Sequence, residues 1–152
     1  MTDIRPVSPT TAAAWLGLRH ALWPEADRAA HARDIERFIA GEASMPLHVL
    51  LAFEGSRAVG LAELGIRSYA EGCATDRVAF LEGWYVVPEA RRRGIGAALV
   101  AAAERWAVGQ GCTELASDTE ADNRVSQDAH LAVGFEEVVQ IRCFRKSLPP
   151  PG

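Results

Sequence analysis

Hydrophobic and polar residues follow two different periods along this chain, and the changes of period predict its secondary structure. Apolar residues spaced three and four apart indicate helices, whereas alternating or continuous apolar runs of about four to eight residues indicate strands. Glycine and proline end most of these segments. The predicted strands cover residues 4–7, 48–54, 58–67, 78–87, 114–117 and 138–145, and the predicted helices cover about 10–23, 27–40, 94–108 and 125–133.

The order of these elements is β-α-α-β-β-β-α-β-α-β, which predicts an α/β (α+β) fold with a central mixed sheet flanked by helices. The strand–helix–strand unit over 78–117 should form a right-handed parallel crossover. In the second helix we expect Ile35, Phe38 and Ile39 to face the core. Because no repeat or linker interrupts the 152 residues, we expect one domain over residues 1–148 and a flexible C-terminal tail over 149–152.

Composition narrows the classes of function. Hydrophobic residues make up 49% and charged residues 24% of the chain, as in a globular protein. A net charge of −4 disfavours nucleic-acid binding, which needs a positive footprint. The chain has neither an apolar run of about 18 residues nor a signal-peptide core, so we expect no membrane partner. The cysteines, Cys73, Cys112 and Cys143, are scattered without metal or disulfide spacing, so we expect no metal. Such an odd and sparse set fits a reducing compartment, and we expect a cytoplasmic protein.

The most informative motif is the segment Val-Val-Pro-Glu-Ala-Arg-Arg-Arg-Gly-Ile-Gly-Ala-Ala-Leu at residues 86–99. A buried strand ends at Pro88, an arginine-rich loop follows, and two glycines flank one residue where a helix begins. The free amides of a helix's first turn bind phosphate, and arginines add charge-assisted contacts. The segment therefore predicts a pyrophosphate-binding loop, with an arginine-rich surface turn as the alternative. It lacks the third glycine of the dinucleotide fingerprint and the lysine of the P-loop.

The pattern Arg91-x-x-Gly94-x-Gly96 after Val-Pro resembles the acetyl-coenzyme A signature of the GNAT N-acetyltransferases. Gly134-Phe135-Glu136 is similar to the closing signature of that superfamily, and the element order fits over nearly the whole chain. The resemblance implies that acetyl-CoA is the co-substrate. It implies that the backbone of Trp84, Tyr85 and Val86 pairs with the pantetheine arm, that Asn123 reaches the cofactor, and that the pyrophosphate is held by Arg92, Arg93, Gly94, Ile95, Gly96 and Ala97.

Other segments resemble, more narrowly, the aminoglycoside 6′-N-acetyltransferases. They are residues 15–24, 80–83, 111–119 and 144–146, together with Tyr69…Gly72-Cys73 and Ser126…His130. This resemblance implies direct acetyl transfer to the 6′-amine of an aminoglycoside, antibiotic resistance and a homodimer. The chain departs from the subfamily at Ala74-Thr75, at 25–27 and at Val139, where the subfamily has acids or a histidine. Those departures leave the range of antibiotics and the physiological substrate open.

Two carboxylates are candidates for binding the amine and accepting its proton. Glu82 lies within a long apolar strand, where a carboxylate is costly unless it is paired or functional, and Asp118 ends the next strand. An amine must be neutral to attack a thioester, so a base or a water chain is required. The sequence does not choose between Glu82 and Asp118. Strand alternation that exposes Glu82, or a cap or turn role for Asp118, is the structural alternative.

Three further side chains are candidates. Trp23 and Tyr69 lie in or beside polar connections, and the resemblance implies that both line the substrate cleft, although Trp23 could instead fix its helix to the core. His130 occupies the helical position where many GNAT enzymes have a tyrosine that reprotonates the thiolate, so it is a candidate general acid or else a packing residue. The rival functions are a GNAT enzyme for another small-molecule or peptide amine, and a non-enzymatic acetyl-CoA-binding sensor.

Overall fold

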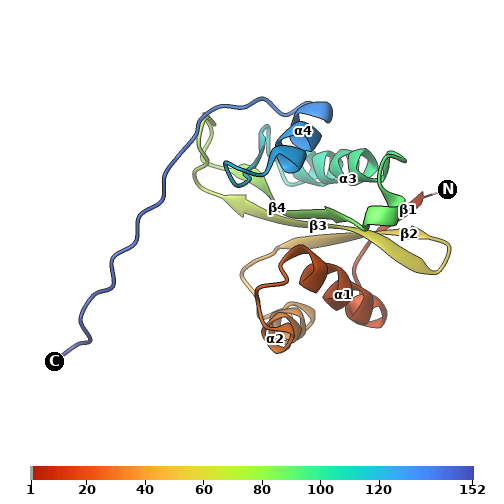
Figure 1. The fold of residues 1–152 in the computed structure, drawn as a ribbon, viewed down its shortest axis with the longest axis horizontal. Helices are drawn as coiled ribbons and strands as arrows, with labels where there is room; N and C mark the ends of the chain where they lie inside the picture. The colour runs from red at the N-terminus through yellow and green to blue at the C-terminus, as the bar shows by residue number, and fades with distance from the viewer. Residues whose placement is uncertain (1) are drawn as a thin grey trace. The chain divides into compact units, whose positions relative to one another are not determined.

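The structure is a computed structural model that describes residues 2–152 (Figure 1). It divides into two units, residues 2–118 and 119–152. The first unit contains a five-stranded sheet in the order β1-β2-β3-β4-β5. Neighbouring strands are antiparallel except for β4 and β5, which are parallel, so the mixed sheet is confirmed. The strands are β1 (Thr2–Pro6), β2 (His48–Glu54), β3 (Arg57–Arg67), β4 (Val78–Val86) and β5 (Leu115–Ser117).

Helices cover both faces of this sheet. The helices α1 (Ala12–Leu22) and α2 (Arg28–Ile39) lie on one face, and α3 (Ile95–Gly109) lies on the other (Figure 1). Short 3₁₀ helices, η1 (Pro9–Thr11) and η2 (Pro88–Ala90), precede α1 and α3. The carboxylate of Asp27 accepts a hydrogen bond from the N–H of Ala29 and so caps α2. Within residues 2–152, no helix combines the length and apolar character needed to cross a membrane.

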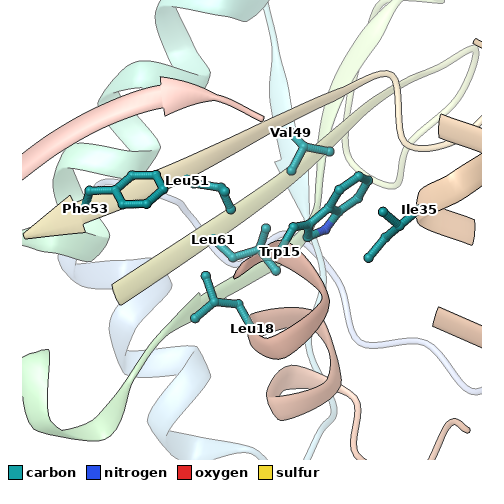
Figure 2. Close-up of a cluster of buried hydrophobic side chains, with 7 residues drawn as sticks. All are labelled: Trp15, Leu18, Ile35, Val49, Leu51, Phe53 and Leu61. Atoms are coloured by element: carbon teal, nitrogen blue, oxygen red, sulfur yellow. The ribbon is translucent and has the colours of Figure 1, made fainter. Parts of the chain in front are cut away.

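The core between the sheet and α1–α2 is built around Trp15, which is fully buried (Figure 2). Its ring meets Phe38 edge-on, with 5.0 Å between the ring centroids. The other members are Leu18, Ile35, Val49, Leu51, Phe53 and Leu61. The prediction for Ile39 was wrong, because its side chain is 36% exposed. Ile39 lies one helical step past Phe38 and turns off the inner face, whose buried positions are His31 and Ile35.

The second unit contains α4 (Arg124–Ala132) and a long C-terminal segment. The predicted strand over 138–145 is wrong for this structure, since residues 135–152 form neither helix nor strand. Val139, Ile141 and Phe144 are exposed, Phe144 by 92%. Alternating apolar residues favour a strand, but a strand also needs a partner for its N–H and C=O groups. Among the described residues, no strand pairs with this segment. The single domain over 1–148 stays a prediction.

Candidate functional site

The two predicted carboxylates lie where the pairing of two parallel strands ends. The pairing of β4 with β3 skips Glu82, which is therefore the extra residue of a β-bulge. Bulges re-aim side chains and are frequent beside active sites. On its other side β4 pairs with β5 only as far as Leu81 and Ser117. The next positions in this register are Glu82 and Asp118, so the structure brings the two residues to adjacent strands.

Glu82 has a charged partner that was not predicted from the sequence. Arg67, at the end of β3, donates from Nε to Oε1 of Glu82 at 3.0 Å and from Nη2 to Oε2 at 2.6 Å. Its guanidinium carbon also lies 3.5 Å from the ring centroid of Phe80. The pKa of Arg67 is raised, first by the hydrogen bond to Glu82 and further by the charges of Glu82 and Asp118. The site therefore holds two carboxylates and one guanidinium.

Trp23 lies directly beside this group. It follows the last residue of α1, and its ring packs on Gly83 so closely that a Cβ at position 83 would come within 2.7 Å of it. The same Cβ would lie 3.1 Å from the side chain of Leu22. Glycine at 83 is thus the residue that lets the end of α1 lie flat on β4, next to Glu82. Trp23 thus attaches its helix to the sheet at the residue next to Glu82, and its role in lining the substrate cleft stays a prediction.

A buried ionic network holds Trp23 from the other side. Glu63 of β3 is 2% exposed. Its carboxylate accepts a 2.9 Å hydrogen bond from Nε1 of Trp15 and lies 3.2 Å from Nη1 of Arg19. Arg19 Nε donates to Nδ1 of His31 at 3.1 Å, and Nε2 of His31 lies 3.0 Å from the carbonyl oxygen of Trp23. Because His31 accepts at Nδ1, its proton belongs on Nε2, where it donates to that carbonyl.

The acidity of Glu63 reflects this burial. Desolvation raises the pKa of Glu63, while the Arg19 charge and the Trp15 hydrogen bond oppose the rise. Glu63 was not predicted from the sequence, because it lies in an apolar strand whose pattern indicates burial but not the partners of a buried group. The only available signal was a lone carboxylate among apolar neighbours, which is the signal that identified Glu82.

Tyr69 lies on the loop between β3 and β4, which the carboxylate of Glu114 holds by hydrogen bonds. Its side chain is 65% exposed, and its hydroxyl donates to Glu71 at 3.1 Å, which raises the pKa of Tyr69. Glu114, just before β5, accepts from the N–H of Ala74 at 3.1 Å and from the N–H and hydroxyl of Thr75 at 2.8 and 2.6 Å. These bonds, the Thr75 hydroxyl first, lower the pKa of Glu114. Tyr69 is therefore exposed on an anchored loop, and its role in lining the substrate cleft stays a prediction.

The predicted pyrophosphate loop has the backbone that such a ligand needs. Arg92 has φ 64 and Gly94 has φ 79, both in the left-handed region. The first hydrogen bond inside α3 runs from the N–H of Ala98 to the carbonyl of Gly94. The N–H groups over 95–97 therefore have no acceptor within the helix, and they lie at its positive end. These groups fit a pyrophosphate.

Other predicted cofactor residues have partners within the protein. The Val86 carbonyl accepts from Arg91 Nε at 2.8 Å, and Arg93 forms an ion pair with Glu54 at 3.1 Å. The side chain of Ile95 is buried in the core, which leaves its backbone for a ligand. The Trp84 ring lies against Gly96, where an added Cβ would be 3.2 Å away. Backbone contacts rather than these side chains are thus the main candidates for holding the cofactor.

Asn123 and His130 belong to the second unit. The side chain of Asn123 accepts from the N–H of Ser126 at 3.1 Å and caps α4. Nδ1 of His130 lies 2.7 Å from the Ser126 carbonyl oxygen, and its ring is 5.2 Å from that of Phe135. Both residues thus help to order α4. Their roles in binding the cofactor and in returning a proton stay predictions.

Comparison with known proteins gives consistent matches. The sequence profile of the Acetyltransferase (GNAT) family matches residues 14–135. An Aminoglycoside N(6′)-acetyltransferase type 1 from Klebsiella aerogenes is 55% identical over 146 residues, which cover 95% of this chain and 96% of that protein. A protein of the same name from Acinetobacter genomosp. 13 is 42% identical over 147 residues, covering 96% and 99%.

Solved structures agree with these matches. AAC(6′)-Iy in complex with the bisubstrate analogue CoA-S-monomethyl-acetylneamine has a TM-score of 0.90 at 39% identity, covering 97% of this chain and 99% of that one. The apo form of AAC(6′)-IG from Acinetobacter haemolyticus has a TM-score of 0.89 at 36% identity, with the same coverage.

Proposed function

Because this chain belongs to the acetyltransferase (GNAT) family, we propose that it transfers the acetyl group of acetyl-CoA to the 6′-amino group of aminoglycosides. Such a transfer confers resistance to these antibiotics. The observation that carries the proposal is the 55% identity to an aminoglycoside N(6′)-acetyltransferase over 95% of the chain. The position of Glu82 and Asp118 on adjacent strands also supports the proposal, because a cationic sugar needs carboxylates to bind its ammonium groups.

Acetyl-CoA supplies the thioester, and the start of α3 is the candidate site for its pyrophosphate. The backbone N–H groups over 95–97 and the loop around Arg92 and Gly94 would hold the phosphates. The adjacent strand residues 84–86 would bind the pantetheine arm. A backbone N–H near Tyr85 or Val86 is the candidate donor to the thioester oxygen as negative charge develops there.

The amine would enter beside Glu82 and Asp118. Its ammonium loses a proton to a carboxylate or to water, and the neutral nitrogen then attacks the thioester carbonyl. A C–N bond forms, the nitrogen gives up its second proton to a carboxylate or to water, the C–S bond breaks, and coenzyme A leaves as a thiolate that takes up a proton. His130 is the candidate donor of that proton. Trp23, held between Gly83 and the buried network, and Tyr69, on its anchored loop, are the candidate walls for the sugar rings.

The experiment that tests this function is thiol release from acetyl-CoA across a panel of amines. Tobramycin and kanamycin should give rapid release, and spermidine and peptide amines little. Faster release with spermidine or a peptide would favour a GNAT enzyme for another amine. Binding of acetyl-CoA without release for any amine would favour a sensor module.

Glu82→Gln and Asp118→Asn test the carboxylates, since loss of a catalytic base lowers kcat by about 10²–10⁴-fold.

We also propose that the chain is a cytoplasmic homodimer. Its three cysteines are unpaired, which suits a reducing compartment. No strand in the described part of the chain pairs with the C-terminal segment, which exposes Val139, Ile141 and Phe144, and β5 is an edge strand of the sheet. An extended segment gains main-chain hydrogen bonds by adding to such an edge. Residues 138–145 of one copy, added to the β5 edge of a second copy, would cover both.

A further inference from the structure

Glu82, one of the two carboxylates proposed to bind the amine, already holds a cation that belongs to the protein. Arg67 contacts both oxygens of Glu82, at 3.0 and 2.6 Å, and its guanidinium carbon is 3.5 Å from the Phe80 ring centroid. The Glu82 side chain is 18% exposed and that of Arg67 40%. A half-exposed arginine paired twice and stacked once is held in one geometry, so its charge stays at a fixed place.

The charges that act on Arg67 come from two elements. Glu82 of β4 pairs with it directly, and Asp118, at the end of β5, interacts with it through space. Met45, from the loop before β2, reaches over Gly65 next to the Glu82 carboxylate and brings no charge. Among the described residues, the local arrangement is therefore two negative charges and one positive charge. Its net charge is one negative, and a single substrate ammonium would balance it.

This arrangement matters because the reaction needs a neutral amine. A carboxylate within about 4–6 Å of a cation favours its charged form, and the shift is about 1–3 pKa units. Two unpaired carboxylates would bind an ammonium tightly and hold its proton equally tightly. An arginine stays protonated throughout the working range of pH, so it repels a bound ammonium and favours proton loss. Arg67 thus lowers the affinity of the site for the ammonium and favours the neutral, reactive amine.

We propose that Arg67 is a positioning and charge-setting residue of the amine site, which keeps the bound amine acidic enough to lose its proton near neutral pH. The proposal rests on the proposed function in one respect, namely that the amine binds beside Glu82 and Asp118. It adds a role for a residue that need not touch the reacting atoms. The planar guanidinium on Phe80 also fixes the Glu82 carboxylate, so the charge effect and the positional effect must be separated by experiment.

Arg67→Gln and Arg67→Lys separate them through the pH dependence of kcat. On the acidic limb kcat rises with pH as the bound ammonium loses its proton. Arg67→Gln should move the midpoint of this limb to higher pH by about one unit or more, so that activity lost near neutrality returns at alkaline pH. Its KM for the aminoglycoside should fall, because the ammonium binds more tightly. Arg67→Lys retains the charge and should keep the wild-type midpoint even if its kcat is lower.

The control is Arg77→Gln, which removes an equal charge from an exposed arginine that donates to the Gln110 carbonyl, and it should leave the midpoint unchanged. A uniform loss of kcat in Arg67→Gln with the midpoint unmoved would overturn the proposal. A wild-type midpoint in the ordinary glutamate range of about 4 to 5 would also overturn the proposal, because the titrating group would then be a carboxyl and not the bound amine.

The amine panel distinguishes failure of the proposed function from failure of the Arg67 proposal. If the panel shows that the enzyme prefers spermidine or a peptide, the aminoglycoside assignment fails. The Arg67 proposal is then decided by the same midpoint measured with the preferred amine. If no amine releases thiol, both fail.

Discussion

The ring of Trp23 lies so close to Gly83 that a Cβ there would be 2.7 Å from Cη2 of the indole. The bulge at Glu82 immediately precedes this contact in β4, so one stretch of strand carries both the carboxylate and the seat of the aromatic wall. The buried chain from Glu63 through Arg19 and His31 ends at the Trp23 carbonyl. Trp23 is therefore held by β4 at its ring and by the buried network at its carbonyl.

Gly83→Ala should disturb the aminoglycoside side of the site alone. The new methyl group must push Trp23 and Leu22 away, and overpacking of this kind costs about 1–3 kcal/mol. We expect the KM for the aminoglycoside to rise about tenfold, which corresponds to about 1.4 kcal/mol, while the KM for acetyl-CoA stays unchanged. Steady-state kinetics with each substrate varied in turn measures both. The matched control is Gly17→Ala in α1, where a Cβ meets no atom within 4 Å. Equal changes in both KM values would contradict the account.

Gly94→Ala should produce the opposite pattern. Gly94 has φ 79, and a residue with a Cβ pays about 1–2 kcal/mol in that conformation. The loop before α3 should therefore distort, and the KM for acetyl-CoA should rise about tenfold while that for the aminoglycoside is unaffected. Gly109→Ala, at the far end of the same helix and with open space around it, is the control. An unchanged KM for acetyl-CoA in Gly94→Ala would remove this loop from the cofactor site.

Glu63→Gln should change how stability depends on pH. The folded-state pKa of Glu63 lies above its ordinary value of 4.5, so between the two values the folded protein holds a proton that the unfolded chain has lost. Stability from this group therefore falls as pH rises through that window and is constant above it. Denaturant unfolding across the acidic range should show the wild type losing free energy of unfolding relative to Glu63→Gln as pH rises. A difference that grows in favour of the wild type would mean that the Arg19 pairing outweighs burial.

Val139→Asp combined with Ile141→Asp should prevent dimer formation. Both side chains lie on one face of the segment if it is extended, and a charge there cannot be buried without a partner. Light scattering should give the wild type twice the chain mass of 16.4 kDa and the double variant that mass alone. Gln140→Asp, on the other face, should remain dimeric. A wild type of 16.4 kDa, or a dimeric double variant, would refute strand addition by residues 138–145.

The sequence predicts the elements well because local periodicity determines them. The apolar spacing identified α1, α2, α3 and α4, and proline or glycine marked their ends. The neighbourhood of Glu82 and Asp118 was also predictable, since Glu82 lies within one strand and Asp118 directly follows the strand that pairs with it in parallel.

The partners of charged groups were not predictable in the same way. Trp15 and Glu63 are 48 residues apart, and no local pattern relates them. Arg67 ends an amphipathic strand, and such an arginine usually faces solvent, so its pairing with Glu82 required the bulge to be known. The predicted strand over 138–145 was wrong for a related reason. Alternating apolar residues favour a strand, but they do not show whether a neighbouring strand is present to pair with it.

The most direct test of the central claim compares neamine with its 6′-hydroxyl counterpart, two substrates that differ at the reacting position alone. Thiol release should be rapid with neamine and its product should carry the acetyl group on the 6′ nitrogen, as read by NMR. The 6′-hydroxyl compound should release thiol at the background rate and bind as an inhibitor. Equal release with both compounds, or acetylation of any other nitrogen of neamine, would contradict the account.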